Sequence, residues 1–359
     1  MTLEGHITAN ELEDEEHWLE QVRGFVDNIL QEAAERQEQL SQLSLELTPV
    51  NPLQRKVSSV WVDGGSTFLD VNGGSVYLVR AAAGYFRPNQ PVVWYVLTSS
   101  GFTTLPRQVD RFVSIQRDIL EIECAMELLG HNPDFVVLDN SLASYATQGV
   151  PHSILEYFTF PTADDSPEHE YFDAFVRFMR RFDVLIQQCQ IRDIPLIGAA
   201  KDPRSRIFAR SLGLTSGMND SSAIAMLAGS RTGFTNVLEA KYLEIPRVKQ
   251  YFEQQSILTE GRGEFLTTFG ILKPNARIFR LDFLRSQQDM RETIQRFIVS
   301  MHDGNGYVLP SHVVHNKATI PDKLSDSLLH LIMSKIAKEN MSVARAVFGS
   351  QRRSRFGRS

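Results

Sequence analysis

Hydrophobic positions follow two different periods along the chain, and each period predicts a different kind of element. Residues 10–45 carry apolar side chains at helical spacing, which predicts a long N-terminal helix that Pro49 and Pro52 bring to an end. Its apolar stripe consists of Trp18, Val22, Phe25 and Ile29. The stripe is expected either to pack against the rest of the domain or to form a seam with a second copy or a partner.

Three apolar runs then alternate with turn-forming residues, which predicts an antiparallel meander. The runs are residues 57–62, 75–83 and 91–98. Residues 108–129 return to helical spacing, and the following run FVVL at 135–138 is apolar throughout, as in a strand buried on both faces. The predicted order of the first half is therefore β-β-β-α-β.

The second half gives a less complete pattern. Residues 168–190 predict an aromatic-rich helix that belongs to the core rather than to a stacking platform, and 194–200 predict a strand that ends at Lys201. A further strand is expected at 276–283 and helices at 287–302 and 322–340. Residues 213–275 give no clear period. We expect three parts: a helical arm at 1–55, a main domain at 56–345 and a basic flexible tail at 346–359.

Two aspartates stand where chemistry is expected. Asp63 closes the run VSSVWV and is followed by two glycines, and Asp139 closes FVVL and is followed by Asn140. An acid at the end of a buried strand, beside residues that let a ligand approach the backbone, suits a divalent metal or a phosphate. Either aspartate alone could equally be a turn former. Their positions on the first and fourth strands suggest one shared acidic site.

Charge is unevenly distributed. The formal net charge is −6, but residues 1–50 carry 12 acidic side chains and two arginines, which leaves a net charge of +4 on the remainder. Such a body neither requires nor excludes DNA, because binding needs only a basic groove. The tail 351–359 has four arginines and no acid, so it is either a solvated segment or a contact for phosphate or a partner.

The composition also bears on the compartment. Without a signal peptide pattern or a long apolar window, the chain is expected to be cytoplasmic, to have no membrane association and to join the nucleoid when active. Cys124 and Cys189 both lie in apolar helical segments, which predicts reduced core residues rather than a disulfide or a zinc site.

The β-β-β-α-β order, with an acid on the first strand, in the helix and after the fourth strand, is the core of a ribonuclease H-like α/β fold, a mixed sheet with flanking helices. In that geometry Asp63 and Asp139 lie side by side, and the helix supplies a third carboxylate. Glu121 and Glu123 are the candidates. Both lie in a helix that is apolar nearly all round, where an unpaired carboxylate is costly to bury, and a metal would remove that cost.

With VDGGS at 62–66, LDNSL at 138–142, Lys201 after a strand, and Tyr307 eight residues before His315, the chain resembles the NurA nuclease family over roughly residues 55–340. Two positions depart from the family pattern. Asn140 replaces the usual glycine of the second motif, and Val308 instead of proline follows Tyr307. The second departure leaves His312 as a competitor of His315.

The resemblance implies a manganese-dependent deoxyribonuclease, with magnesium as the alternative metal, that cuts single strands and digests DNA from 5′ ends. It implies a homodimer that works with a HerA-type hexameric ATPase in DNA end processing and repair. The implied metal ligands are Asp63, Glu121 or Glu123, Asp139 and His315. Tyr307 would lie beside them, and Lys201 would meet the scissile phosphate. Arg204 and Arg206 add positive charge near Lys201 for DNA binding.

This ligand set suits phosphodiester hydrolysis. Carboxylates favour hard ions such as magnesium or manganese, and an imidazole shifts the choice towards manganese. Two other functions fit parts of the sequence. The turn Asp63-Gly-Gly-Ser-Thr also matches the phosphate-binding turn of actin-like ATPases and sugar kinases, although no convincing second turn follows. The chain could also be a non-catalytic regulatory subunit that retained the fold.

Overall fold

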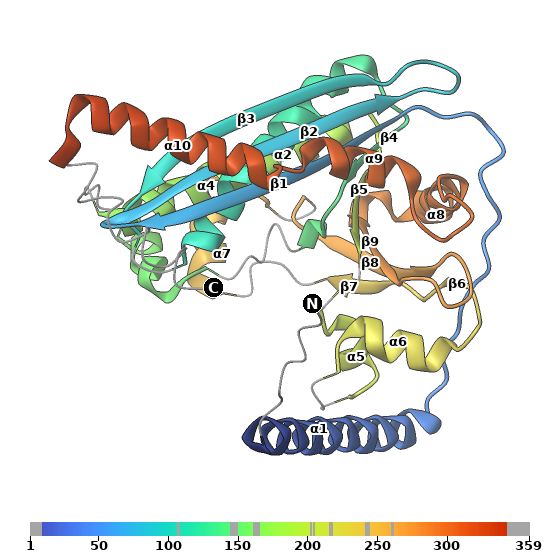
Figure 1. Cartoon of the computed structure of the whole chain (residues 1–359). Coiled ribbons are helices and arrows are strands. Elements are labelled where there is room, and N and C mark those ends of the chain that lie inside the picture. The colour runs from blue at the N-terminus through green and yellow to red at the C-terminus, as the bar shows by residue number, and fades with distance from the viewer. Residues whose placement is uncertain are drawn as a thin grey trace. The chain divides into compact units, whose positions relative to one another are not determined.

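The computed structural model describes residues 9–105, 108–143, 150–160, 166–201, 203, 205–214, 218–240, 245–259 and 262–342 (Figure 1). The chain divides into two compact units. One consists of Met1–Glu46 and Arg204–Gly229, and the other of Leu47–Pro203 and Ser230–Ser359. In the described part of the chain, no helix is both long enough and apolar enough to cross a membrane.

The larger unit is built on one mixed sheet, with strand order β3-β2-β1-β4-β5-β9-β8-β6 and with β7 also paired to β8. The strands are β1 (Ser59–Val71), β2 (Gly74–Phe86), β3 (Val93–Thr103), β4 (Phe135–Leu138), β5 (Leu196–Lys201), β6 (Gly233–Phe234), β7 (Leu238–Ala240), β8 (Phe265–Ile271) and β9 (Phe279–Leu284). The first three form the predicted antiparallel meander, and β1 pairs in parallel with β4. The mixed α/β fold and the adjacency of the first and fourth strands are thus confirmed.

One strand boundary was predicted wrongly. The first strand does not end before Asp63 but continues through Gly64 and Gly65 as far as Val71, and the chain reverses at Asn72 and Gly73. Gly73 has a φ of 87°, which suits glycine at a hairpin turn. Gly64 and Gly65 therefore lie within a strand instead of forming a phosphate-binding turn.

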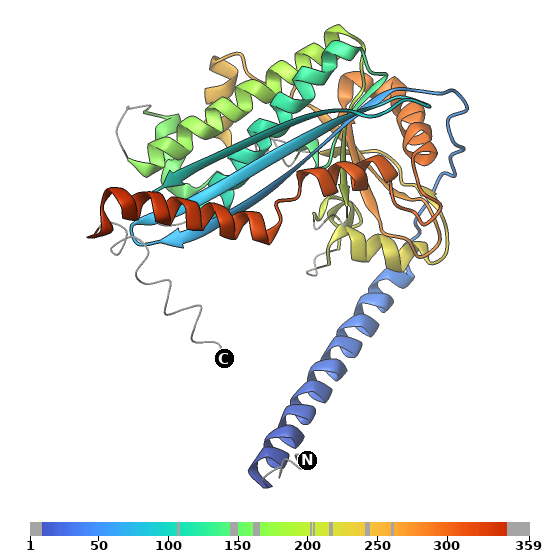
Figure 2. The same ribbon diagram turned by 45° about the horizontal axis from the view of Figure 1, so that its top comes forward.

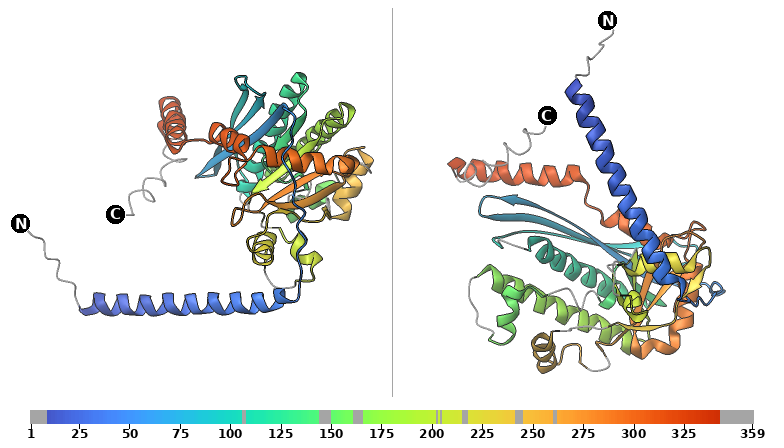
Figure 3. Two further views of the ribbon diagram at one scale, coloured as in Figure 1. Left: turned by 90° about the vertical axis from the view of Figure 1, so that its right-hand side faces the viewer. Right: turned by 90° about the horizontal axis from the view of Figure 1, so that it is seen from below.

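The two glycines let helices approach the strand from both sides. A Cβ on Gly64 would overlap the carboxylate of Glu121 on α2 (Val109–Leu128), and a Cβ on Gly65 would lie 2.6 Å from the carbonyl oxygen of Ala318 on α9 (Leu309–Ala318). Because successive residues of a strand face opposite sides, α2 and α9 cover opposite faces of β1. Figures 2 and 3 show this sandwich, with α4 (Pro167–Ile191) packed behind α2.

The core on the side of β4 is aromatic and aliphatic. Phe135 on β4 stacks on Phe297 of α8 (Arg291–Ser300) with ring centroids 3.9 Å apart, and Trp61 of β1 lies against the same ring. The aromatic residues of α4 are buried as predicted; they are Tyr171, Phe172, Phe175, Phe178 and Phe182. Cys124 and Cys189 are also buried and free, as expected, and burial raises the pKa of each thiol to about 12.

The remaining elements of this unit are short or peripheral. They are η1 (Leu129–His131), η2 (His152–Phe158), α7 (Pro246–Gln254), η3 (Arg285–Met290) and α10 (Asp322–Glu339). The predicted helix at 287–302 is therefore split between η3 and α8, and the predicted helix at 322–340 corresponds to α10.

The smaller unit contains α1 (Ala9–Ser41), α5 (Ile207–Ser211) and α6 (Asp220–Ala228). Asp220 is fully buried and accepts hydrogen bonds from the Ser205 hydroxyl and from two backbone N–H groups, which joins the start of α6 to α5. On α1, the side chains of Trp18, Val22 and Phe25 are exposed. The side chain of Ile29 and the tail 346–359 lie outside the described residues.

Candidate metal centre

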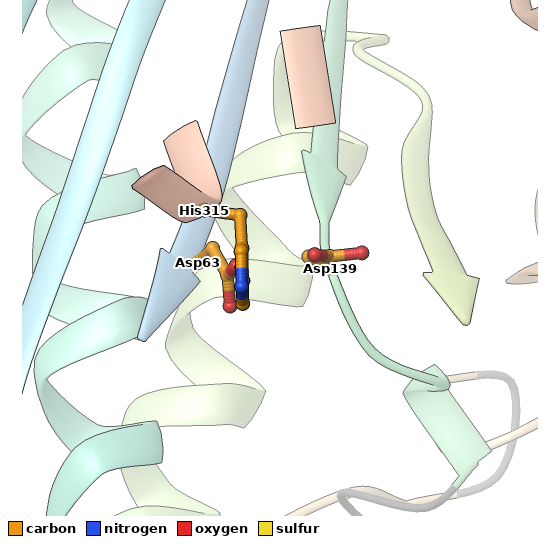
Figure 4. A group of neighbouring side chains, drawn as sticks. All are labelled: Asp63, Asp139 and His315. Carbon is orange, nitrogen blue, oxygen red and sulfur yellow. The ribbon is translucent and has the colours of Figure 1, made fainter. Parts of the chain in front are cut away.

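The two aspartates meet because of strand register. In the parallel pair β1–β4, Val62 is opposite Leu138, so Asp63 and Asp139 follow at equivalent positions. The backbone N–H of Asp139 donates to the carbonyl of Val62 at 2.9 Å, which holds the start of the loop after β4 against β1. Asp63 is 7% exposed. The register of β1 with β4 therefore places both aspartates side by side at one point of the sheet (Figure 4). The sequence could only suggest this.

The histidine comes from α9, which covers the face of β1 to which both Asp63 and Gly65 point. His315 lies on α9, and its Nδ1 is 2.7 Å from Oδ2 of Asp63. One ligand atom from each of Asp63, Asp139 and His315 lies within 4.8 Å of the others, which is a geometry that a metal ion can occupy (Figure 4). His312, the competing candidate, is exposed, and its Nε2 faces Asn316 at 3.3 Å. The fold therefore brings His315, and not His312, to the aspartates.

The helix α2 separates the two glutamate candidates. Glu121 is 3% exposed, and its carboxylate lies where a Cβ of Gly64 would be, on the face of β1 that α2 covers. The ligand atoms that lie within 4.8 Å of one another come from Asp63, Asp139 and His315, and Glu121 is not among them. Glu123 instead faces α4, with its Oε1 3.7 Å from Nε of Arg181. Two residues of helix turn the side chain by about 200°, so neighbouring acids on one helix cannot both face the same strand.

Arg117 is a residue of the site that the sequence analysis missed. Its Nε lies 3.1 Å from Oε1 of Glu121, and its Nη2 lies 2.8 Å from the buried carboxylate of Asp118. Its stem also lies against Gly64. The available signal was its position four residues before Glu121, because residues at i and i+4 share a helix face.

Lys201 occupies the predicted place at the end of β5. Its Nζ lies 2.7 Å from Oδ2 of Asp139, and the side chain is 39% exposed. The strand order explains this contact, because β5 is the other parallel neighbour of β4. Lys201 thus stands at the solvent side of the acidic pair.

The remaining candidates have other recorded contacts or are not described. Tyr307 is exposed in the turn before α9; its ring lies under the guanidinium of Arg277 at 5.7 Å, and its N–H donates to Asp303. Arg206 belongs to the smaller unit, where it donates to the carbonyl of Leu214. Arg204 is outside the described residues.

The charges of the centre show that it lacks a cation. Burial, and then the negative charge of Asp139, raise the pKa of Asp63 to about 8, although the Gly64 N–H and Lys201 act in the opposite direction. Burial and the second carboxylate thus both disfavour the ionised form of Asp63 in the protein by itself. A divalent cation would supply the missing positive charge. Two carboxylates and one imidazole are also a suitable donor set for manganese, so the residues fit the expected metal.

Comparison with known proteins identifies the family of the chain. A family model described as the NurA domain matches residues 61–320. The chain is similar to the NurA nuclease from Sulfolobus solfataricus, with 17% identity, 93% of this chain and 98% of that chain covered, and a TM-score of 0.63. No curated protein sequence matches the chain.

Two further structural matches contain manganese. A structure of NurA with manganese has 12% identity, covers 87% of this chain and 97% of that chain, and gives a TM-score of 0.59. NurA bound to dAMP and manganese has 14% identity, coverage of 85% and 94%, and a TM-score of 0.53. At these identities the structural likeness shows a shared fold.

Proposed function

Because the chain belongs to the NurA nuclease family, we propose that it is a divalent-metal-dependent deoxyribonuclease whose centre is formed by Asp63, Asp139 and His315. The observation that carries the proposal is the convergence of these three ligand atoms within 4.8 Å from β1, the end of β4 and α9. Manganese is the preferred ion and magnesium the alternative, because the imidazole adds a nitrogen donor to hard oxygen ligands. The manganese in two similar structures supports this choice.

Each side chain has a separate role in this proposal. Asp63, Asp139 and His315 hold the ion. Glu121 lies against Gly64 and is paired with Arg117, so it would have to turn towards Asp63 to act as the further ligand from the helix. A bound divalent ion would lower the pKa of a coordinated water and neutralise charge on the scissile phosphate. Lys201, partly exposed beside Asp139, would contact the scissile phosphate and orient the DNA strand. Arg117 would balance the charge of Glu121 until the centre is loaded.

The sandwich around β1 keeps these groups in place. Gly64 and Gly65 allow α2 and α9 to contact the strand closely, so Glu121 lies against Gly64 on one face of β1 and His315 contacts Asp63 from the helix on the other face. The strand arrangement also disfavours the ATPase interpretation of Asp63-Gly-Gly-Ser-Thr, because the segment is extended and pairs with β2 along its length. A phosphate-binding turn would need backbone N–H groups that point at the ligand.

We further propose that the substrates are single-stranded DNA and 5′ ends of duplexes, and that the chain acts as a homodimer with a HerA-type ATPase in DNA end processing. The dAMP in one similar structure is consistent with a deoxynucleotide product. The body of the chain is only mildly basic, and affinity for DNA rests largely on phosphate contacts, so a partner that delivers DNA would help. The exposed Trp18, Val22 and Phe25 on α1 offer a docking surface for it.

A cleavage assay tests the nuclease proposal. The purified chain should cut a labelled single-stranded oligonucleotide when manganese is added, and cleavage should stop when a chelator is added in excess. Asp63→Ala should abolish the activity, whereas Asp70→Ala, which removes an exposed aspartate from the same strand, should leave it unchanged. Equal cleavage by Asp63→Ala and wild type would show either a contaminating nuclease or a different centre, and the proposal would fail.

Partner docking needs a separate measurement. Trp18→Glu combined with Phe25→Glu should leave basal cleavage intact and weaken stimulation by the ATPase. Ile191→Glu, a charge placed on an equally exposed apolar side chain of α4, is the control. Full stimulation of the α1 variant would exclude this surface as the docking site.

A further inference from the structure

A buried polar cluster lies outside the centre and has no part in the roles given above. Asp282 on β9 is fully buried, and Arg280 on the same strand is 3% exposed. Nε of Arg280 lies 2.6 Å from Oδ1 of Asp282 and 3.0 Å from the hydroxyl of Thr267 on β8. A buried ion pair is weak evidence for stability, because desolvation offsets most of its attraction. Its other contacts therefore matter.

The second oxygen of Asp282 connects this cluster to the loop of the acidic centre. Oδ2 accepts the hydroxyl hydrogen of Ser141, and it lies 3.2 Å from the backbone nitrogen of Ala143, which donates to it. Ser141 follows Asp139 by two residues, and Ser141 itself is 2% exposed. One buried carboxylate thus fixes two points of the segment that leaves β4 directly after Asp139.

The sheet is shaped to receive this segment. Gly198 on β5 is opposite Asp282 on β9, so both residues face the same side of the sheet. A Cβ on Gly198 would lie 2.6 Å from the carbonyl oxygen of Asn140 and 2.6 Å from the nitrogen of Leu142. The loop therefore lies directly on β5. Because Gly198 has no side chain, the loop comes close enough for Ser141 to hydrogen-bond to Asp282.

From these contacts we infer that Asp282 is a positioning residue for Asp139, an inference that rests on the proposed function. The segment that carries Asp139 is held on both sides. The hydrogen bond from the Asp139 N–H to Val62 holds one side, and the Ser141–Asp282 bond holds the other. Asp282 with its counterion Arg280 thus keeps the second carboxylate facing the metal position.

Ser141→Ala tests the inference with the least disturbance, because it removes the link but keeps the Arg280–Asp282 pair. Manganese binding to the full chain, measured by titration calorimetry without DNA, should weaken about tenfold, as for other outer-shell partners of metal ligands. Ser141→Thr, which keeps the hydroxyl, should restore binding. The matched control is Ser59→Ala, which removes an equally buried hydroxyl that accepts from Trp61 on the strand of Asp63. Its manganese affinity should equal that of wild type.

A second variant removes the acceptor without leaving a buried charge. Arg280→Met combined with Asp282→Leu replaces the pair by apolar side chains of similar size, which a folded core tolerates better than a single unpaired charge. It should bind manganese at least as weakly as Ser141→Ala, because it also removes the acceptor of the Ala143 N–H. Adding Ser141→Ala to it should cause no further loss, since the Ser141 hydroxyl no longer has this carboxylate to bind. Wild-type affinity in Ser141→Ala, or independent losses that add, would overturn the inference.

Hydrogen exchange separates this inference from the proposed function. In the metal-free chain, Ser141→Ala should speed amide exchange in a peptide covering 135–143, and Ser59→Ala should not. A wild-type chain that binds no manganese would overturn the proposed function. The exchange comparison would still test whether Ser141 anchors the segment after β4. Equal protection of this peptide in wild type and Ser141→Ala would overturn the inference.

Discussion

The short parallel pair β1–β4 carries aspartates at both of its ends, and the groups that surround the carboxylates differ between the two ends. Asp134, just before β4, accepts hydrogen bonds from the N–H and the hydroxyl of Ser58 at 2.8 and 2.9 Å. It therefore joins the two strands. Asp139, just after β4, has its carboxylate beside Asp63, a second acid, with Lys201 at the solvent side.

This difference shows how to separate structural acids from functional acids in one sheet. An acid that serves the fold is surrounded by donors that the protein supplies. An acid that serves a ligand faces like charge, so its own protein leaves it short of positive charge, as the raised pKa of Asp63 shows. The two ends can be told apart by experiment, because activity and stability should respond in opposite ways.

The largest effect is expected at the end after β4. Asp139→Ala should reduce DNA cleavage about a thousandfold or more, the upper range for loss of one preorganised catalytic group. The fold should survive, and the metal-free stability should stay equal or rise, because a like charge is removed from beside Asp63. Cleavage rate and a urea unfolding curve measure the two quantities. A variant that cleaves like wild type would place the centre elsewhere.

The second effect distinguishes the two glutamates of α2. Glu121→Gln should lower cleavage about a hundredfold, because its carboxylate lies against Gly64 beside Asp63. Glu123→Gln should change it less than about twofold, because an exposed pair such as Glu123 with Arg181 contributes little. Single-turnover cleavage at saturating manganese compares them. The reverse order would assign the ligand to Glu123.

The third effect concerns the metal itself. Manganese at about one hundred times its dissociation constant should stabilise the wild-type chain by about 2.7 kcal/mol, because it binds the folded state. Asp63→Ala should lose this stabilisation and Asp134→Ala should keep it. Thermal unfolding with and without manganese measures the shift. A stabilisation that persists in Asp63→Ala would mean that the ion binds at another place.

The smallest effect is expected at the end before β4. Asp134→Ala should lower the free energy of unfolding by about 1–3 kcal/mol, because two hydrogen bonds to a carboxylate are lost. Its cleavage rate per folded molecule should match wild type. The more distant Arg55, 3.8 Å away and well exposed, should add little, so Arg55→Ala is a control. A loss of activity in folded Asp134→Ala would remove the contrast between the two ends.

Part of this contrast could be predicted from the sequence. The first half gives long, regular periods, so the meander, α2 and β4 were predicted within a few residues, except for the far end of β1. Asp139 could be placed directly after β4 because FVVL is short and bounded. Residues 213–275 gave no period because most of their elements are short, and the seven-residue β8 is buried along its whole length and so shows no regular alternation. β6 has two residues and β7 three, while α6 and α7 have nine each.

Other features required the tertiary structure. Gly64 and Gly65 have the composition of a turn, and only the approach of α2 and α9 shows that they allow close packing within a strand. The choice between Glu121 and Glu123, and between His312 and His315, depends on which side of a helix faces β1. Asp282 gave no sequence signal, and Arg117 gave only its spacing of four residues from Glu121, because their roles depend on contacts with Ser141 and Glu121.

The sequence by itself determined the order of the elements, the family and the two aspartates, because local periodicity and short motifs carry that information. The tertiary structure decided which further side chains meet these aspartates. His315 is 252 residues from Asp63 in the chain, and no local pattern specifies a contact over that distance. The register of β1 with β4 and the packing of α2 and α9 on the two faces of β1 specify it instead, because they fix which atoms share one small volume.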